Sequence, residues 1–302
     1  MTNLESGLSG CKIELLNSNT LRKYSSSREY NKRLELQIKK QSLFSHFVFR
    51  NLDAPKIYQV NRRDIISFDM EYVSGFSFDE YFLYASICDV ENVLQSLFDY
   101  LDFLIENSKV YHDNISKKII YEKLISLDVE NKNFLYHISR KVVDNDLKVP
   151  YSFCHGDLTF ANIIFHPKRL YLIDFLDSFI DSYLVDFAKL KQDLYYHWNL
   201  KIQNKTNLRL YQIYDYLWKN IERRYSKYLN TTSFQVIDSM NLLRIEPYLT
   251  NDNHRSILKK LVEKTDLYED FNRANGGKIF SLSEYETKVD VNASKKESFH
   301  GN

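Results

Sequence analysis

Alternating apolar and polar residues mark short strands in the first quarter of the chain. Residues 28–46 instead repeat apolar side chains at the spacing of a helical face, and Ser27 is a candidate N-cap for that helix. The predicted strands cover residues 11–16, 19–25, 54–60 and 64–73. The pattern therefore predicts a small sheet that is accompanied by one helix.

From Phe78 onward the apolar pattern is mainly helical, with one short β segment inside it. The predicted helices cover 79–107 (as one or two helices), 117–127, 131–144, 181–198, 207–228, 233–249 and 253–264. The predicted strands of the β segment cover 151–155, 161–165 and 169–175. The HPKR turn at 166–169 separates the last two of these strands.

This layout predicts an α+β protein with unequal parts. We expect a small β-rich N-terminal lobe over residues 1–74 and a larger, mainly helical C-terminal lobe over residues 75–274. Residues 275–302 are polar and lack periodicity, so we expect a flexible tail there. A length of 302 residues suits one large domain or two smaller lobes.

Composition and charge exclude several classes of protein. Hydrophobic residues make up 44% of the chain, charged residues 27%, and the net charge is +1, so we expect no nucleic-acid partner. No apolar run reaches the length of a membrane span, and the first residues lack the features of a signal peptide. Cys11, Cys88 and Cys154 are scattered, which is typical of reduced thiols. We expect a cytoplasmic protein without membrane insertion, and the oligomeric state stays open.

The β segment carries a group of polar residues with regular placement. His155, Gly156 and Asp157 are followed by Asn162 and then by Asp174, each beside an apolar strand. A loop carboxylate can take a proton from a hydroxyl, and Asn and Asp oxygens suit Mg²⁺. A base next to metal-held phosphates is the arrangement that phosphoryl transfer needs. The alternative is an ordinary turn, because Asp and Asn are common turn residues.

The spacing of these residues resembles the catalytic loop and metal-binding strand of the aminoglycoside phosphotransferase and choline kinase family. That resemblance implies a two-lobed protein-kinase-like fold with ATP and Mg²⁺ as cofactors. It implies that Asp157 is the catalytic base and that His155 braces the loop. Asn162 and Asp174 would be the magnesium ligands. Asp186 is the best match to a downstream Asp that supports the loop in family members.

The same resemblance assigns nucleotide-binding roles in the N-terminal part. Gly7 and Gly10, in SGLSG, would cover the phosphates, and Lys23 would contact the α- and β-phosphates. Glu35 is the candidate ion-pair partner of Lys23, although neighbouring basic residues leave a solvent-exposed role open. Arg22 should face the opposite side of the strand from Lys23.

The segment MEYVSGFSFDEY, residues 70–81, resembles the hinge of the family. The backbone of Glu71 and Val73 would bind the adenine edge, and Gly75 would let the chain turn into the second lobe. Because backbone groups make this contact, the side chains do not specify it.

Taken together, these features imply an ATP-dependent small-molecule kinase. The acceptor would be a hydroxyl of an amino alcohol, a sugar or a related metabolite, and some similar proteins act in surface polysaccharide biosynthesis. A protein kinase is an alternative, but HGD replaces HRD and no APE segment follows Asp174. A catalytically silent ATP-binding or scaffold protein is a further alternative. The intact set of Lys23, Asp157, Asn162 and Asp174 counts against it.

Residues near the motif suggest how an acceptor could bind. Asp177, Asp181 and Asp186 could hold a cationic acceptor, or they could be charges near a helix N-terminus. Aromatic residues of the following helices could form a cage for a quaternary ammonium group, although core packing is the commoner role. These aromatic residues are Tyr195, Tyr196, Trp198, Tyr214 and Trp218.

Overall fold

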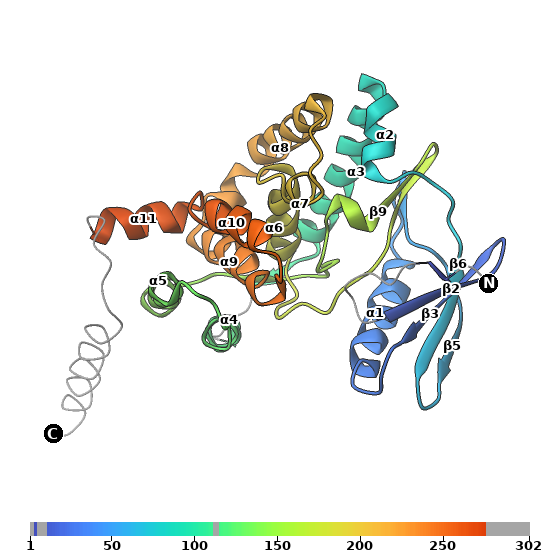
Figure 1. Cartoon of the computed structure of the whole chain (residues 1–302), viewed down its shortest axis with the longest axis horizontal. Helices are drawn as coiled ribbons and strands as arrows, with labels where there is room; N and C mark the ends of the chain where they lie inside the picture. The colour runs from blue at the N-terminus through green and yellow to red at the C-terminus, as the bar shows by residue number, and fades with distance from the viewer. Residues whose placement is uncertain (1–2, 5–10, 111–114, 276–302) are drawn as a thin grey trace. The chain divides into compact units, whose positions relative to one another are not determined.

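The structure is a computed structural model that describes residues 3–4, 11–110 and 115–275 (Figure 1). The chain folds into two compact units. The first comprises Met1–His112 and Val149–Leu229, and the second comprises Asp113–Lys148 and Asn230–Asn302. The expected boundary between residues 74 and 75 falls inside the first unit, so the proposed lobes stay a prediction. The expected tail, apart from Asn275, lies outside the described residues.

An antiparallel sheet opens the first unit and confirms the predicted strands. Its strand order is β1-β2-β3-β6-β5. Alternation along β3 buries Lys23 and turns Arg22 to the other face, where it pairs with Asp69 at 2.7 Å. The bounds are β1 (Asn3–Leu4), β2 (Cys11–Asn17), β3 (Thr20–Ser25), β5 (Ile57–Arg62) and β6 (Ile66–Glu71).

Helix α1 (Asn31–Phe44) lies beside this sheet and closes its core (Figure 1). Leu34 and Ile38 pack in one buried cluster with Cys11, Phe68 and Met70 of the strands. The helix begins later than predicted, and Ser27 does not cap it. The carbonyl of Ser27 accepts a hydrogen bond from the amide of Tyr30, which forms a turn before the helix.

The rest of the first unit is mainly helical and contains the predicted hairpin. Strands β9 (Ile163–His166) and β10 (Arg169–Leu172) pair antiparallel, with Ile163 opposite Leu172. A short strand that the pattern did not predict, β4 (Leu52–Asp53), pairs parallel with β10. The remaining elements are α2 (Phe78–Tyr84), α3 (Ile87–Glu106), β7 (Lys109–Val110), β8 (Pro150–Tyr151), η1 (Phe160–Asn162), α6 (Tyr183–Leu194), α7 (Trp198–Ile202) and α8 (Leu208–Leu229).

The expected turn at Gly75 is a close approach of two chain segments instead. A Cβ at this position would lie 2.4 Å from Cγ2 of Ile164 and 2.9 Å from the carbonyl oxygen of Phe165. The next residue, Phe76, exchanges backbone hydrogen bonds of 2.9 and 3.0 Å with Phe165. Gly75 therefore allows the connector to lie directly against β9.

The second unit is helical over its described residues. Its helices are α4 (Ile115–Ile125), α5 (Lys132–Asp144), α9 (Thr232–Leu243), η2 (Glu246–Tyr248), α10 (Asp252–Val262) and α11 (Asp266–Asn275). The predicted helix 233–249 ends early, at Leu243, and Pro247 lies in the separate short helix η2. Helix α11 was not predicted. It packs on α5, where the rings of Tyr268 and Phe134 lie 5.0 Å apart.

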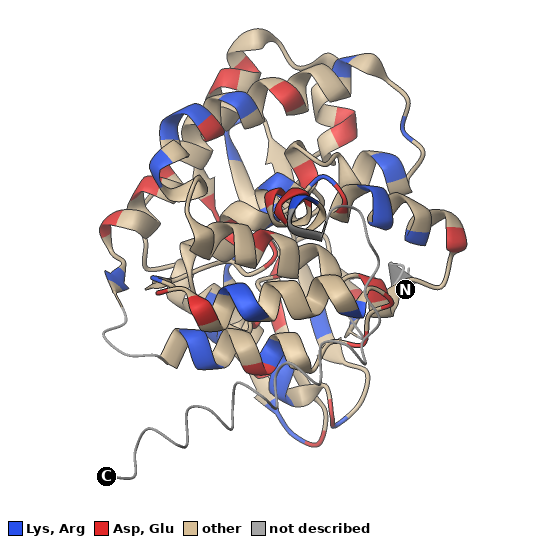
Figure 2. Ribbon diagram, turned by 90° about the vertical axis from the view of Figure 1, so that its left-hand side faces the viewer, with Lys and Arg blue, Asp and Glu red and all other residues tan. Residues whose placement is uncertain are grey.

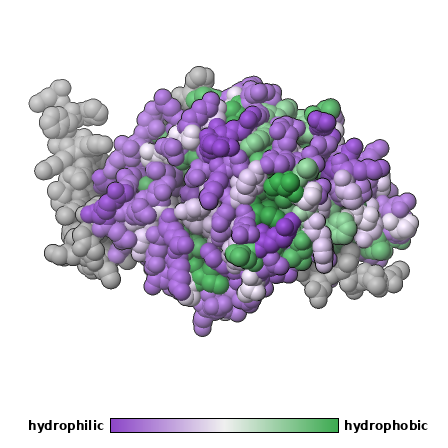
Figure 3. Space-filling view, turned by 90° about the horizontal axis from the view of Figure 1, so that it is seen from above, coloured by the Kyte–Doolittle hydropathy of each residue, from purple (hydrophilic) through white to green (hydrophobic). Residues whose placement is uncertain are grey.

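The surface carries intermixed charges and dispersed apolar groups. In the view of Figure 2, basic and acidic residues alternate along the helices. Figure 3 shows a face on which hydrophilic residues predominate and hydrophobic residues form small separate groups. Among the described residues, no helix combines the length and apolar character that a membrane span requires.

Candidate active site

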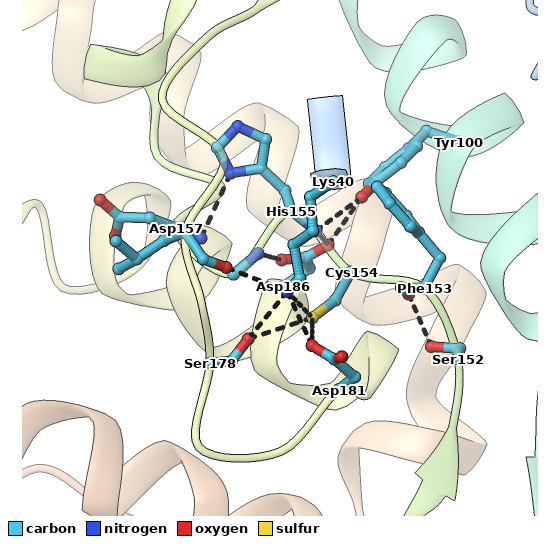
Figure 4. Close-up of polar contacts among 12 residues, drawn as sticks. Lys40, Tyr100, Ser152, Phe153, Cys154, His155, Asp157, Ser178, Asp181 and Asp186 are labelled. Carbon is cyan, nitrogen blue, oxygen red and sulfur yellow. Dashed lines mark hydrogen bonds and ion pairs between the residues drawn. The ribbon is translucent and has the colours of Figure 1, made fainter. Parts of the chain in front are cut away.

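A buried carboxylate shapes the loop that carries the HGD motif (Figure 4). Asp186, in the first turn of α6, accepts hydrogen bonds of 2.8 Å from the backbone amides of His155 and Gly156 and from the hydroxyl of Tyr100. Because the amides of His155 and Gly156 donate to this carboxylate, they do not pair with a neighbouring strand. The predicted strand 151–155 therefore ends at Tyr151. Burial raises the pKa of Asp186, and His155 and the hydrogen bonds act in the opposite direction. Asp186 thus takes the supporting position that the sequence indicated.

Gly156 cannot carry a side chain in this loop. Its φ is +86°, a left-handed conformation that L-residues rarely adopt, and an added Cβ would lie 2.3 Å from the carbonyl oxygen of Leu176. The amide of Leu176 donates a 2.8 Å hydrogen bond to the carbonyl of His155. The glycine therefore lets the loop approach the segment that follows Asp174.

His155 is fully buried, and the positions of both ring nitrogens are fixed by hydrogen bonds. Nε2 lies 2.8 Å from the carbonyl oxygen of Ile173, so it must donate, and Nδ1 accepts from the amide of Asp157 at 3.2 Å. Burial lowers the pKa of His155, although nearby acids act in the opposite direction, so the ring is neutral at pH 7. A neutral ring with both nitrogens occupied holds the loop in place.

Asp157 is held by two side chains and still reaches the surface. Its Oδ2 accepts a 2.8 Å hydrogen bond from Nδ2 of Asn162, and its Oδ1 lies 3.1 Å from Nζ of Lys189. Burial alone would raise the pKa of Asp157, but the charge and hydrogen bond of Lys189 contribute to a net lowering. The carboxylate is therefore ionised at neutral pH, and 31% of the side chain is exposed. Lys189 lies outside the motif residues, and no sequence pattern marked it as part of the site.

Asn162 and Asp174 offer oxygen atoms of the kind that suits a magnesium ion. Nδ2 of Asn162 already donates to Asp157, so its Oδ1 is the atom left for a metal. Asp174, just after β10, adopts a left-handed φ of 59°, a conformation that is often found at functional sites. In the described part of the chain, no cluster of three or more His, Cys, Asp or Glu side chains could hold a metal. Two oxygen ligands fit Mg²⁺, because this ion keeps waters and takes phosphate oxygens.

The predicted ion pair between Lys23 and Glu35 is wrong. Lys23, only 1% exposed, donates to Oδ1 of Asp174 at 2.5 Å, while Glu35 pairs with Arg62 at 2.8 Å on the surface. The inward face of α1 carries Gln37, whose amide lies 3.4 Å from the same Asp174 oxygen. The polar side chain that α1 directs toward Asp174 is therefore a glutamine, although an acid was expected from this helix.

The adenine contact at the hinge stays a prediction, and the structure shows which backbone groups there already have partners. The amide of Glu71 donates to the carbonyl of Lys56 at 2.8 Å, and the amide of Tyr72 donates to Asn19 at 2.9 Å. Adenine binding at Glu71 is thereby limited to the carbonyl group. Among the described residues, the backbone of Val73 has no hydrogen-bond partner. The predicted phosphate loop with Gly7 and Gly10 lies outside the described residues.

Lys40 of α1 fixes the segment after Asp174 (Figure 4). Its Nζ donates to the carbonyl of Leu176 at 2.9 Å and to Asp181 at 2.7 Å, so Asp181 already has a cationic partner. Sγ of Cys154 lies 3.5 Å from the same nitrogen. Burial raises the pKa of Cys154 to about 12, so its thiol stays protonated at neutral pH.

The aromatic residues proposed for a cation cage belong mainly to the core. Only Tyr195 is exposed, at 44%, and Lys191 lies 5.5 Å from the centre of its ring. The buried members are Tyr196, Trp198, Tyr214 and Trp218. Core packing, which was the commoner role expected for this stripe, is confirmed for these four residues, because buried rings cannot enclose a ligand. Of the three acids that could attract a cationic acceptor, Asp177 is the exposed one.

The fold is similar to that of several aminoglycoside phosphotransferases. A thermostable mutant of aminoglycoside phosphotransferase APH(4)-Ia, in a ternary complex with ADP and hygromycin B, superposes with a TM-score of 0.57 at 11% identity, over 88% of this chain and 93% of that chain. The GDP complex of wild-type aminoglycoside 2'-phosphotransferase-IIIa gives 0.54 at 14% identity, over 90% and 92%. APH(2'')-Ib bound to ADP gives 0.50 at 15% identity, over 88% and 93%.

These likenesses establish the fold as the kinase-like fold of the aminoglycoside phosphotransferases, with a sheet region followed by a helical region. No curated protein matches the chain in sequence. Residues 131–223 match the phosphotransferase enzyme family, and this range contains the HGD loop and the β9–β10 hairpin. Over these residues the chain is similar to that family.

Proposed function

We propose that this protein transfers the γ-phosphoryl group of ATP to a hydroxyl of a small molecule. The observation that supports this most strongly is the state of Asp157, an ionised and partly exposed carboxylate that Asn162 holds at 2.8 Å. Such a group can orient a hydroxyl and accept its proton. The similarity of residues 131–223 to the phosphotransferase enzyme family supports the same reaction class.

The other residues would bind the nucleotide and its metal. Oδ1 of Asn162 and the carboxylate of Asp174 would hold Mg²⁺, which supplies charge neutralisation for the phosphates. Lys23, buried beside Asp174, is the cation for the α- and β-phosphates. We further propose that the carbonyl of Glu71 and the amide of Val73 bind the adenine edge. Gly7 and Gly10 remain the proposed phosphate cover.

The acceptor that we propose is an amino alcohol, a sugar or a related metabolite, including one used in surface polysaccharide biosynthesis. Two of the similar phosphotransferases were solved with hydroxyl-bearing ligands, which supports this class of acceptor. APH(4)-Ia was solved with hygromycin B, and APH(2")-IIia was solved with GDP and kanamycin. In this chain Asp177 is the exposed acid that could attract a cationic acceptor.

A silent nucleotide-binding protein is the second candidate, and one observation favours it. Gln37 of α1 donates to Asp174, and the acid of the same helix, Glu35, pairs with Arg62. The helix therefore supplies no carboxylate to orient Lys23. The lysine instead pairs with a residue that the metal would need. A silent protein would bind ATP, but no acceptor would stimulate its turnover.

The test is ADP release from ATP, and in parallel from GTP, with a panel of amino alcohols, sugars and aminoglycosides. We expect at least one acceptor to stimulate release, and we expect Asp157→Ala to abolish the stimulated rate. Asp146→Ala is the control, because Asp146 is exposed and lies in the other compact unit. ATP binding without stimulation by any acceptor would support the silent protein instead.

A further inference from the structure

Helix α6 places three charged side chains on the face that meets the HGD loop. Asp186, Lys189 and Asp193 follow one another at spacings of three and four residues, which is the spacing of one helical face. Asp186 accepts the amides of His155 and Gly156, and Asp193 accepts the amide of Phe160 at 2.7 Å. These two acids therefore hold the backbone of the loop.

Lys189 differs from both acids because it contacts a side chain of the loop. Its Nζ lies 3.1 Å from Oδ1 of Asp157, and its own side chain is 14% exposed. It also donates to Oε1 of Gln192 at 3.3 Å. An ammonium group that is this well covered loses much of its hydration, so its place in the fold depends on pairing with the carboxylate.

The pair fixes the orientation of Asp157. Asn162 holds Oδ2 and Lys189 holds Oδ1, so the plane of the carboxylate is defined from both ends. Each carboxylate oxygen can accept more than one hydrogen bond, which leaves room for a hydroxyl. Correct orientation of a base matters, because small displacements of reacting groups reduce rates strongly.

The pair also brings positive charge to the loop. Residues 155–162 contain no Lys or Arg, so the loop itself offers no cation next to its base. The ammonium group of Lys189 lies 3.1 Å from Oδ1 of Asp157. An acceptor hydroxyl that is hydrogen-bonded to the same oxygen would therefore lie close to this ammonium group. Phosphoryl transfer develops negative charge at this place, and a fixed cation there stabilises it.

We propose that Lys189 is a positioning residue for phosphoryl transfer: it orients Asp157 and provides the positive charge next to the transferred group. This proposal rests on the proposed function for its effect on rate. The contact itself depends only on the fold, so the two ideas can be tested separately.

The kinetic test compares Lys189→Met, Lys189→Arg and the control Lys191→Met. Lys191 lies on the same helix and is buried, and its ammonium contacts the rings of Tyr195 and Tyr196. We expect Lys189→Met to lower kcat about 100-fold while KM for ATP changes less than about threefold. Arginine should recover most of the loss, and Lys191→Met should keep kcat within about threefold. Wild-type kcat in Lys189→Met, or equal losses in Met and Arg variants, would overturn the proposal.

A second measurement does not require turnover. Denaturant midpoints are measured for Lys189→Met, Asp157→Asn and the double variant by tryptophan fluorescence, since Trp198 and Trp218 both lie in the first unit. If the pair forms, the shift caused by Lys189→Met becomes smaller in the Asp157→Asn background. Additive shifts overturn the proposal even if the wild type is an active kinase. A coupled pair in a protein that phosphorylates no acceptor overturns the proposed function and with it the kinetic role of Lys189.

Discussion

Replacement of Asp186 by asparagine tests how the HGD loop is held. The carboxylate accepts three hydrogen bonds of 2.8 Å, from the amides of His155 and Gly156 and from the hydroxyl of Tyr100. Asparagine has one acceptor oxygen, and its amide group would face a backbone N–H. One buried amide without an acceptor costs about 1–3 kcal/mol, and a neutral acceptor weakens the bonds that remain.

Burial also raises the pKa of Asp186, because the buried charge itself costs free energy. Removal of the charge therefore recovers part of the stability that the lost hydrogen bonds would cost. We therefore expect Asp186→Asn to lower the free energy of unfolding by about 2–3 kcal/mol. Tyr100→Phe is the graded comparison. It removes the bond that the hydroxyl donates to Asp186 and the 3.1 Å bond that it accepts from the amide of His155, but both amides still donate to Asp186. It should cost about 1 kcal/mol.

The assay is urea unfolding at pH 7, followed by tryptophan fluorescence of the first unit. Acceptor-stimulated turnover is measured on the same samples. Because the loop carries Asp157, we expect turnover to fall more in Asp186→Asn than in Tyr100→Phe. A stability of Asp186→Asn within about 0.5 kcal/mol of the wild type would refute the reasoning, since surface substitutions have effects of that size.

The remaining predictions concern three neighbouring groups. Gly156→Ala and Gly156→Asn should both abolish turnover, because either Cβ meets the carbonyl of Leu176; full activity of the asparagine variant would show that φ alone matters. Burial raises the pKa of Asp193 to about 6 from its ordinary value of 3.8, so its ionisation should cost about 3 kcal/mol of stability. The protonated carboxyl of Asp193 contributes this stability in full below pH 4, and the contribution is lost as the pH rises through 6. Asp193→Asn should therefore flatten the dependence of the free energy of unfolding on pH, measured by urea unfolding. Lys40→Met should lower the free energy of unfolding by about 2 kcal/mol in the same assay, because it removes charge-assisted bonds to Leu176 and Asp181.

The part of the site that could be predicted from the sequence is local in the chain. The motif residues flank two consecutive strands, and an antiparallel hairpin brings the ends of such strands together. Asn162 precedes Ile163, whose partner is Leu172, and Asp174 follows that partner closely. Strand alternation likewise predicted the opposite directions of Arg22 and Lys23.

The Glu35 assignment failed because it used distance along the chain instead of helical phase. Leu34, Ile38 and Phe44 mark the inward face of α1. Gln37 lies between Leu34 and Phe44 around the helix axis, while Glu35 lies about 60° outside this face, beyond Ile38. The apolar spacing already present in the sequence could therefore have selected Gln37. It could not have shown that Lys23 pairs with Asp174, because these residues meet only through the tertiary fold.

Contacts from distant segments were the least predictable. Lys189 and Lys40 look like ordinary surface lysines in sequence, yet each contacts the loop or the segment next to it. The aromatic stripe was compatible with both a cage and a core, and only burial decided between them. At Gly75 the sequence indicated a special backbone position, but the close approach to Ile164 depends on a neighbouring strand.

The transfer of a phosphoryl group is tested most directly by its product. Wild-type protein and Asp157→Ala are incubated with ATP, Mg²⁺ and the acceptor panel, and the acceptors are analysed by mass spectrometry. We expect one acceptor to gain the mass of a single phosphoryl group with the wild type and to stay unmodified with Asp157→Ala. Equal product from both proteins, or no product from the wild type with any acceptor, would contradict the assignment of Asp157 as the base of a small-molecule kinase.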